Sequence, residues 1–403
     1  MRLAVELYGL IVGHIDAQGP QDFDFTASAE AISRFGINSD VLSVAVPLTD
    51  RPPRHHAARR RNFFNELLPE GDILTWMLER SGLRRGDTPA FLARYGRDIA
   101  GAVQIWDVDD PSEPPTPENT PVSDREIRSL LESPMSDPLA NSRRSGRTSL
   151  AGVQPKIVLA QRDGRWHRVA GGYPSTHIIK PSLSAHPTVI GDEEYGWRLA
   201  RAIGLADYRV ELTAFAELPA LVIERFDRDT RGERLHQEDF NQALGAAGDE
   251  KYQEVGGAVT LKRIAETVRR RCPRPELIRL ARQVVLCCAI GNLDMHAKNL
   301  GLMHLPDQKT TLAPAYDMVP MAQHRDSDGR LALTVDRHYR LADVTHSSLV
   351  SELSSWKLSD AERIVTEALE EIRTAVEAET PDLSASPDLQ ELIGQRTQRL
   401  LER

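Results

Sequence analysis

The sequence predicts an α+β protein in which an N-terminal, mainly β subdomain precedes two lobes, the second of them helical. Strand-like runs separated by turn residues fill much of the first hundred positions. A second group of strand-like runs follows a proline-rich stretch, and helical periodicity dominates the C-terminal half. At 403 residues, of which 40% are hydrophobic, the chain is long enough for two or three domains with real cores.

The first domain is expected to comprise residues 1–106. Its opening strand-like runs suggest an antiparallel sheet or a small barrel. Helical spacing of apolar residues follows, and a final strand is expected at 101–106. The expected strands are LAVELYG (3–9), 10–15, DFDFTAS (22–28) and VLSVAVP (41–47), and the expected helices are 62–68, 73–82 and 88–95.

Residues 107–147 are expected to form a linker, because prolines and acidic residues interrupt any periodicity there. Residues 148–235 are expected to form a small sheet with one helix, in which Asp163-Gly164 is a strong hairpin signal. Residues 236–403 are expected to form the helical lobe. The expected strands are 156–160, 165–170, 176–180, 210–214 and 220–226, with a helix at 193–203.

Polar residues crowd positions 292–299, directly after an apolar helix that is expected to end near Gly291. Asp294 precedes Asn299 by five residues, the separation that protein kinases use between the carboxylate facing the substrate hydroxyl and the amide that holds magnesium. Asp317 would supply the second metal-binding group. From this stretch alone, the alternative that these residues cap turns and helices stays open.

A phosphotransferase also needs a cation on the nucleotide phosphates and a carboxylate that holds it. Lys180 ends an expected strand and Glu194 lies on the following helix, so they form an ion-pair candidate, although two unrelated surface charges are the alternative. The segment 222–226 could offer its backbone to a purine, but its composition is that of an ordinary strand end. The small residues of 149–156 could cradle phosphate with successive amides, although the sequence contains no GxGxxG before the first strand of this lobe and no GxxxxGK[ST].

Taken together, the ordered motifs resemble the HipA family of toxin kinases, and the resemblance covers nearly the whole chain. The exceptions are the proline-rich stretch and the last turns. The motifs are NFFNELLPEG (62–71), GRDIAGAVQ (96–104), the loop 149–156, THIIKP (176–181), ERFDR (224–228), RLHQEDF (234–240), Lys251-Tyr252, GNLDMHAKN (291–299) and APAYDM (313–318).

The resemblance implies a divergent two-lobed protein-kinase-like fold and an ATP- and Mg²⁺-dependent serine/threonine-protein kinase. By this resemblance Asp294 is the catalytic base, and Asn299 and Asp317 bind magnesium. Ser149 matches a serine whose autophosphorylation in the family expels the phosphate loop and silences the enzyme. Pro155 stands at a position that is often acidic in the family, and it stiffens the loop. The implied ATP-binding residues are Ala151, Gly152, Val153, Gln154, Lys156, Lys180, Glu224, Arg225, Phe226, His296 and Lys298.

The resemblance also implies partners. The protein substrate would be an aminoacyl-tRNA synthetase, whose phosphorylation halts translation, and a small helix-turn-helix antitoxin (HipB-like) would neutralise the toxin and link it indirectly to operator DNA. One alternative is a catalytically weak co-repressor that docks the antitoxin on DNA. Another is a small-molecule kinase, against which the Ser149 loop and the N-terminal domain argue.

The composition argues against several other classes of protein. The formal net charge of −9 argues against a protein coated everywhere by nucleic acid. Three cysteines, two of them adjacent at Cys287 and Cys288, cannot form a disulfide framework and are expected to be core thiols in a reducing cytoplasm. The chain has no apolar run near the ~18 residues that cross a membrane, and its N-terminus is expected to be a first strand rather than a signal peptide. A cytoplasmic protein without a membrane partner is therefore expected.

Overall fold

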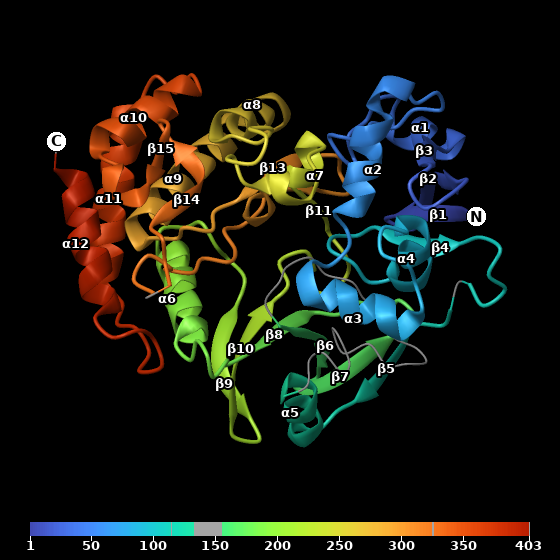
Figure 1. The fold of residues 1–403 in the computed structure, drawn as a ribbon, viewed down its shortest axis with the longest axis horizontal. Helices are drawn as coiled ribbons and strands as arrows, with labels where there is room; N and C mark the ends of the chain where they lie inside the picture. The colour runs from blue at the N-terminus through green and yellow to red at the C-terminus, as the bar shows by residue number, and fades with distance from the viewer. Residues whose placement is uncertain (114, 133–154, 325, 403) are drawn as a thin grey trace. The chain divides into compact units, whose positions relative to one another are not determined.

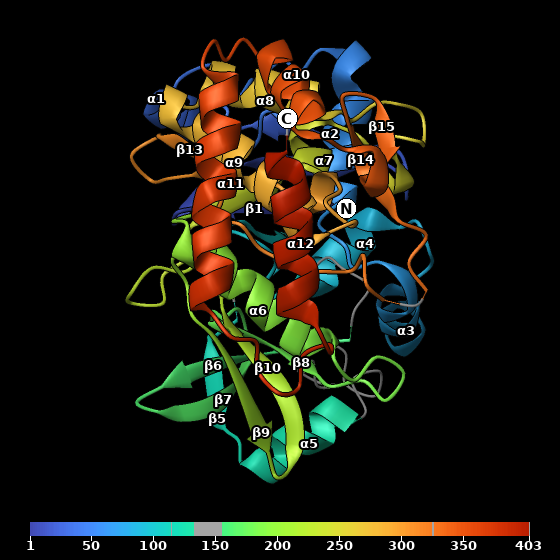
Figure 2. The same ribbon diagram turned by 90° about the vertical axis from the view of Figure 1, so that its left-hand side faces the viewer.

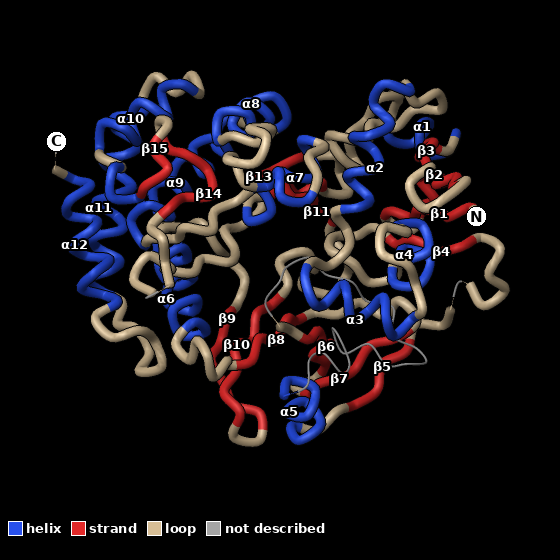
Figure 3. The backbone as a smooth tube through the Cα atoms, viewed as in Figure 1, coloured by secondary structure: helices blue, strands red, loops and turns tan. Residues whose placement is uncertain are grey.

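The computed structural model describes residues 1–113, 115–132, 155–324 and 326–402, and its chain divides into two compact units (Figure 1). The first unit contains Met1–Pro181, Thr213–Ala247 and Met303–Lys309, and the second contains Ser182–Leu212, Gly248–Leu302 and Thr310–Arg403. Both units mix helices and strands (Figure 3), which confirms the expected α+β class.

An antiparallel sheet of order β3-β2-β1-β4 opens the first unit. Tyr8 and Gly9 form a two-residue hairpin loop between β1 and β2, with φ of 53° and 75°, as a type I′ turn requires. The Tyr8 hydroxyl accepts a hydrogen bond from the His236 N–H at 2.8 Å and donates one to the His304 carbonyl. These bonds hold the tyrosine in the turn. The strands are β1 (Arg2–Leu7), β2 (Leu10–Ala17), β3 (Phe23–Ala27) and β4 (Gln104–Asp107).

The strand expected at 41–47 was wrong. These residues form turns, although Val41, Leu42, Ala45 and Val46 are buried in the core of the sheet. The Glu238 carboxylate accepts hydrogen bonds from the Val44 N–H at 2.9 Å and from the Ser43 hydroxyl at 2.5 Å. These donors are therefore satisfied by a side chain and not by the neighbouring strand that was expected. The helices of this part of the unit are α1 (Ala29–Phe35), η1 (Arg54–His56), α2 (Ala57–Asn65), α3 (Gly71–Ser81) and α4 (Thr88–Tyr95).

A six-stranded sheet has the order β5-β7-β6-β8-β10-β9. Asp163 and Gly164 join β6 to β7 with φ of 50° and 71°, which confirms the expected hairpin. Ile157 and Leu159 pack against α5 on one face, whereas Val158 packs with α3 and α4 on the other. The strands are β5 (Glu118–Pro121), β6 (Ile157–Arg162), β7 (Arg165–Ala170), β8 (His177–Pro181), β9 (Val210–Phe215) and β10 (Leu218–Glu224).

The stretch expected as a linker contains β5 and a helix, α5 (Asp124–Glu132). Ile127, Leu130 and Leu131 follow helical spacing and are buried in the core of the six-stranded sheet. Because prolines flank α5 on both sides, its short apolar pattern was assigned to the linker in the sequence. The domain boundaries as a whole remain a prediction.

The chain also contributes shorter elements to the first unit. β11 (His236–Asp239) leads into α7 (Phe240–Leu244), where Asp239 forms a capping box with Gln242. The last residues of β12 (Gly301–His304) also belong to this unit.

Helices dominate the second unit, as expected. The central helix α9 (Arg274–Ile290) is buried over most of its length and ends at Gly291, whose φ is 78°, so the expected helix end is confirmed. α11 (Ala361–Ala378) and α12 (Leu389–Leu401) lie side by side (Figure 2), and both contact α9. The other elements are α6 (Val189–Ala202), η3 (Gly248–Lys251), α8 (Leu261–Arg271), η4 (Ala297–Asn299), β13 (Thr310–Leu312), β14 (Arg330–Val335), β15 (His338–Arg340), η5 (Leu341–Asp343) and α10 (His346–Ser355).

The three cysteines are free, and Cys287 and Cys288 are buried on α9 as expected. Burial raises the pKa of Cys288 to about 12, so its thiol stays protonated and unreactive. Among the described residues, no helix has the length and apolar character needed to cross a membrane.

Candidate functional site

The loop that follows α9 begins where two backbones cross closely. The carbonyl of Gly291 accepts the N–H groups of Met321 and Ala322, both at 2.9 Å. A Cβ atom at position 291 would lie 2.7 Å from the Ala322 Cβ, so only glycine fits here in its left-handed conformation. The end of α9 is thereby tied to the chain that follows Asp317.

Asn292 makes a second connection between the same two segments. Its side chain is 2% exposed, its Oδ1 accepts the Asp294 N–H at 3.1 Å, and its Nδ2 donates to the Asp317 carbonyl at 3.1 Å. This one amide therefore fixes the backbones of two predicted site residues relative to each other. Sequence reasoning assigned it no role, although a polar residue directly after a buried helix was the available signal.

The Asp294 carbonyl organises the rest of the loop. It accepts the His296 N–H at 2.7 Å and the Asn299 Nδ2 at 2.8 Å. The Nδ2 bond fixes the amide plane of Asn299 and leaves Oδ1, a hard oxygen, as the side-chain atom for a cation. The Asp294 side chain is 40% exposed, with its Oδ2 3.8 Å from the His296 Nε2, so the carboxylate is accessible within an otherwise buried loop.

Asp317 adopts a left-handed conformation with φ of 55°, which aspartate tolerates better than most residues. Burial raises the pKa of Tyr208 well above the usual value, and the charges of Glu193, Asp317 and Asp207 add to this. Asp317 and the buried Glu193 of α6 therefore both disfavour ionisation of the same phenol. Sequence reasoning overlooked Glu193.

The oxygen donors of Asn299 and Asp317 are of the type that magnesium prefers. No group of three or more histidine, cysteine, aspartate or glutamate side chains suited to a metal occurs in the described part of the chain. Magnesium does not need one, because it is usually bound by one or two protein oxygens, with water and phosphate completing its octahedron. Asn299 and Asp317 provide such a pair of oxygen donors.

Two further motif residues flank the loop within the second unit. The Tyr252 ring meets the His296 ring edge to face, with centroids 5.3 Å apart, and the buried Lys251 lies with its Nζ 5.2 Å from the Tyr252 ring centre. The Tyr316 hydroxyl donates to the Lys298 carbonyl at 2.8 Å. The Lys251-Tyr252 motif therefore packs against the loop 292–299, although it was absent from the predicted site.

The remaining predicted residues belong to the first unit or lie outside the described residues. Lys180 is a buried residue of β8, opposite Leu221 of β10, and Lys156 is half-buried at the start of β6. Glu224 ends β10 and Phe226 follows it, half-buried. The predicted positions outside the described residues are Ser149, Ala151, Gly152, Val153 and Gln154.

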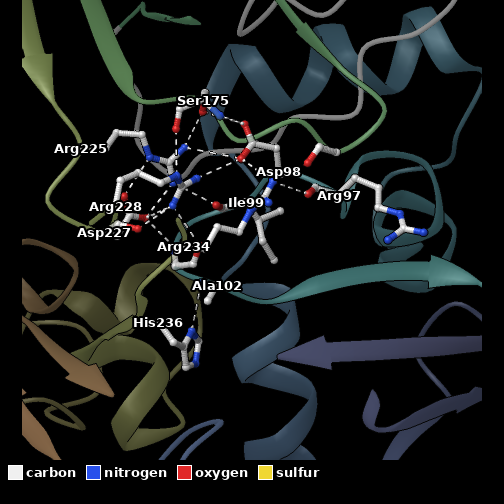
Figure 4. Close-up of polar contacts among 12 residues, drawn as sticks. Arg97, Asp98, Ile99, Ala102, Ser175, Arg225, Asp227, Arg228, Arg234 and His236 are labelled. Atoms are coloured by element: carbon white, nitrogen blue, oxygen red, sulfur yellow. Dashed lines mark hydrogen bonds and ion pairs between the residues drawn. The ribbon is translucent and has the colours of Figure 1, made fainter. Parts of the chain in front are cut away.

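Arg225, another predicted ATP-binding residue, directs its guanidinium into the interior of the first unit. Its backbone N–H donates to the Thr176 carbonyl at 2.9 Å, and its guanidinium forms two hydrogen bonds with Asp227, at 2.9 and 2.7 Å (Figure 4). It also donates to the Ile99 carbonyl at 3.0 Å. The last charged residues of the ERFDR motif, Arg225, Asp227 and Arg228, thus lie in a buried cluster of the first unit.

Asp98 is the acidic centre of that cluster. Its carboxylate lies 3.0 Å from the Arg228 guanidinium and 3.3 Å from that of Arg234, and it accepts the Ser175 hydroxyl at 2.7 Å. Burial alone would raise the pKa of Asp98, but the guanidinium groups of Arg225, Arg228 and Arg234 hold it below the usual value. The GRDIAGAVQ and ERFDR motifs, far apart in sequence, therefore meet in one ion cluster.

Glu194, expected to pair with a lysine, instead pairs with Arg198 of its own helix at 2.8 Å. Burial raises its pKa, which Arg198 partly offsets. The two residues line an open cavity of about 590 Å³ together with Thr380 and Asp382. The buried acidic residues of this turn are Asp192 and Glu193.

Comparison with known proteins identifies the class of this fold. The solved complex of HipA, HipB and operator DNA from Shewanella oneidensis MR-1 matches with a TM-score of 0.79, covering 99% of this chain and 96% of that chain at 23% identity. The two therefore share a fold.

Family models and curated relatives give the narrower result. Residues 3–106 match the HipA N-terminal domain, and residues 148–380 match the HipA-like C-terminal domain. The putative kinase Y4mE of Sinorhizobium fredii is 32% identical over 346 residues, which cover 83% of this chain and 81% of the relative. The serine/threonine-protein kinase toxin HipA of Shewanella oneidensis is 28% identical over 361 residues, covering 84% and 79%. The chain belongs to the HipA family.

Proposed function

We propose that this protein is an ATP- and magnesium-dependent serine/threonine-protein kinase that acts in the cytoplasm as the toxin of a toxin–antitoxin pair. One observation carries the proposal. The loop 292–299 holds an accessible Asp294 carboxylate, the Asn299 amide donates to the Asp294 carbonyl and leaves its oxygen for a cation, and Asn292 links the backbones of Asp294 and Asp317. A kinase requires these three groups together.

Each residue of the loop has a proposed role. Asp294 orients the substrate hydroxyl and accepts its proton as the oxygen–phosphorus bond forms, while the bond from the γ-phosphorus of ATP to its bridging oxygen breaks and ADP leaves. Asn299 and Asp317 hold magnesium, which when bound neutralises charge on the phosphates. Lys298 faces the transferred phosphoryl group. The His296 N–H stabilises the conformation of the loop by donating to the Asp294 carbonyl.

The nucleotide side of the proposal uses the first unit. Lys180 binds the phosphates, and the backbones of Glu224 and Phe226 meet adenine. Arg225 contributes through the buried cluster that holds this strand end, rather than by touching ATP. The loop Ala151–Lys156 covers the phosphates, and Ser149 is the autophosphorylation site.

The partners are proposed from the family. We infer that the substrate is a hydroxyl of an aminoacyl-tRNA synthetase and that a small helix-turn-helix antitoxin neutralises the toxin and carries it to operator DNA. A complex with HipB and operator DNA has been solved for the Shewanella oneidensis protein, which supports a partner of this kind.

Intact mass tests the proposal. Wild type and Asp294→Asn are incubated with magnesium and ATP, with and without candidate synthetases, and the 143–156 segment is then mapped by peptide mass. Phosphate should appear on Ser149 or on a synthetase with wild type only. ATP binding without transfer to either would favour the co-repressor, and no ATP binding would overturn the kinase assignment.

A further inference from the structure

The connection between α11 and α12, residues 379–386, contacts one face of α6 along its length. Asp192, Tyr195 and Arg198 are spaced by three residues and therefore share that face. The Tyr195 hydroxyl donates to the Glu379 carbonyl at 3.0 Å. Arg198 donates to the Glu379 carboxylate and to the Thr380 carbonyl, both at 2.9 Å. We call residues 379–386 the clasp.

Asp192 joins three segments of the second unit at the beginning of α6. Its side chain is fully buried and accepts the N–H and the hydroxyl of Ser386, at 2.6 and 2.7 Å. It also accepts the Thr188 hydroxyl at 3.1 Å and lies 2.9 Å from the His324 Nε2. A buried carboxylate is tolerated only when it is so fully hydrogen-bonded. Asp192 therefore ties α6 to the clasp and to the chain that follows Asp317.

Two glycines bring the backbone of α6 against the same two segments. A Cβ atom at Gly191 would lie 2.7 Å from the Ala385 nitrogen, in the clasp. A Cβ atom at Gly196 would lie 1.8 Å from the carbonyl oxygen of Met318, the residue next to Asp317. Backbone atoms cannot move aside as the end of a side chain can, so any shift of α6 is passed directly to the residue beside Asp317.

We propose that the clasp is a positioning element of the magnesium–nucleotide site. The clasp fixes α6 through Asp192, and α6 fixes Asp317 through the contact of Gly196 with Met318. This inference rests on the proposed role of Asp317 in binding magnesium. Asp192 and Ser386 are positioning residues, because their contacts lie with α6, the clasp and His324 rather than with the proposed metal ligands.

The test compares Asp192→Asn and Ser386→Ala with a matched control. Gln390→Ala removes a bond within the α11–α12 pair, the 2.7 Å donation to the Val376 carbonyl, and leaves α6 untouched. The readout is the Mg²⁺ concentration that gives half-maximal ATP-dependent phosphorylation. Asp192→Asn should raise it about tenfold, a typical coupling between sites, while kcat at saturating Mg²⁺ stays within about twofold. Ser386→Ala should act in the same direction but less, and Gln390→Ala should match wild type.

Amide hydrogen exchange in the peptide covering 315–322, measured without nucleotide, gives a readout independent of catalysis. Exchange there should be faster in Asp192→Asn than in Gln390→Ala. If both the Mg²⁺ dependence and this exchange equal those of the control, the clasp does not position the site. If wild type binds no Mg²⁺–ATP, the proposed function and the clasp's role in it both fail, whatever the exchange shows. Should Asp192→Asn fail to fold, Ser386→Ala decides by the same two measurements.

Discussion

Asn292→Ala should separate the catalytic loop from the Asp317 segment. The substitution removes the acceptor that Asn292 provides at 3.1 Å for the partly buried Asp294 N–H, and a donor left unsatisfied in the protein costs about 1–3 kcal/mol. The Asp317 carbonyl loses a donor too, but it keeps the Val319 N–H at 3.0 Å, so its loss is smaller. We therefore expect a fall of about 2 kcal/mol in the free energy of unfolding. We also expect at least about a tenfold loss of kcat/KM, since 1.4 kcal/mol of lost positioning already suffices for that.

Urea unfolding gives the stability change, and ATP-dependent phosphorylation over a range of Mg²⁺ concentrations gives the kinetic change. Thr397→Val is the matched control, because it removes a buried hydroxyl that donates to the Ile393 carbonyl at 2.8 Å on α12. The control should lose stability while keeping the Mg²⁺ dependence of wild type. Equal Mg²⁺ dependence and kcat in Asn292→Ala and wild type would refute the reasoning, even if stability fell as expected.

Three further outcomes follow from the contacts. Gly196→Ala should cost about 3 kcal/mol by overpacking, whereas Gly394→Ala, whose Cβ would meet only Val376 at 3.8 Å, should be neutral in urea unfolding. Asp98→Asn should cost about 3–5 kcal/mol because three largely buried guanidinium groups then share the single carboxylate of Asp227, and a loss under 1 kcal/mol would contradict the cluster's role. Burial and the charge of His304 lower the pKa of His236 to about 4, so the folded state binds fewer protons than the unfolded state between about pH 6.5 and 4. The free energy of unfolding should therefore fall by about 3 kcal/mol as the pH is lowered through that window, and His236→Gln should flatten this slope.

The sequence predicted the parts of the fold that depend on local pattern. The apolar period of α9, its end at Gly291 and the Asp163-Gly164 hairpin all follow from neighbouring residues, and all three are confirmed. The strand expected at 41–47 failed because its apolar residues serve a buried turn whose polar groups bind a distant carboxylate. No local pattern carries that information.

The site residues divide in the same way. The five-residue spacing of Asp294 and Asn299 was enough to predict both as site residues. In the structure the Asn299 side chain is hydrogen-bonded to the Asp294 carbonyl within one loop. Glu194 illustrates the limit, because adjacent helix residues point about 100° apart and the sequence does not show which of them is buried. Glu194 pairs with Arg198 of its own helix, whereas the neighbouring Glu193 is buried.

The buried cluster explains why two motifs far apart in sequence belong together. Charges taken out of water need partners of matched geometry, and removing any one of them leaves the others uncompensated. Asp98 comes from the N-terminal domain, and Arg225, Asp227 and Arg228 come from the end of β10, so neither segment can bury its charges alone. The strand end proposed to meet adenine is thus held by the N-terminal domain. It follows that truncating that domain should impair ATP binding even though none of its residues is proposed to touch the nucleotide.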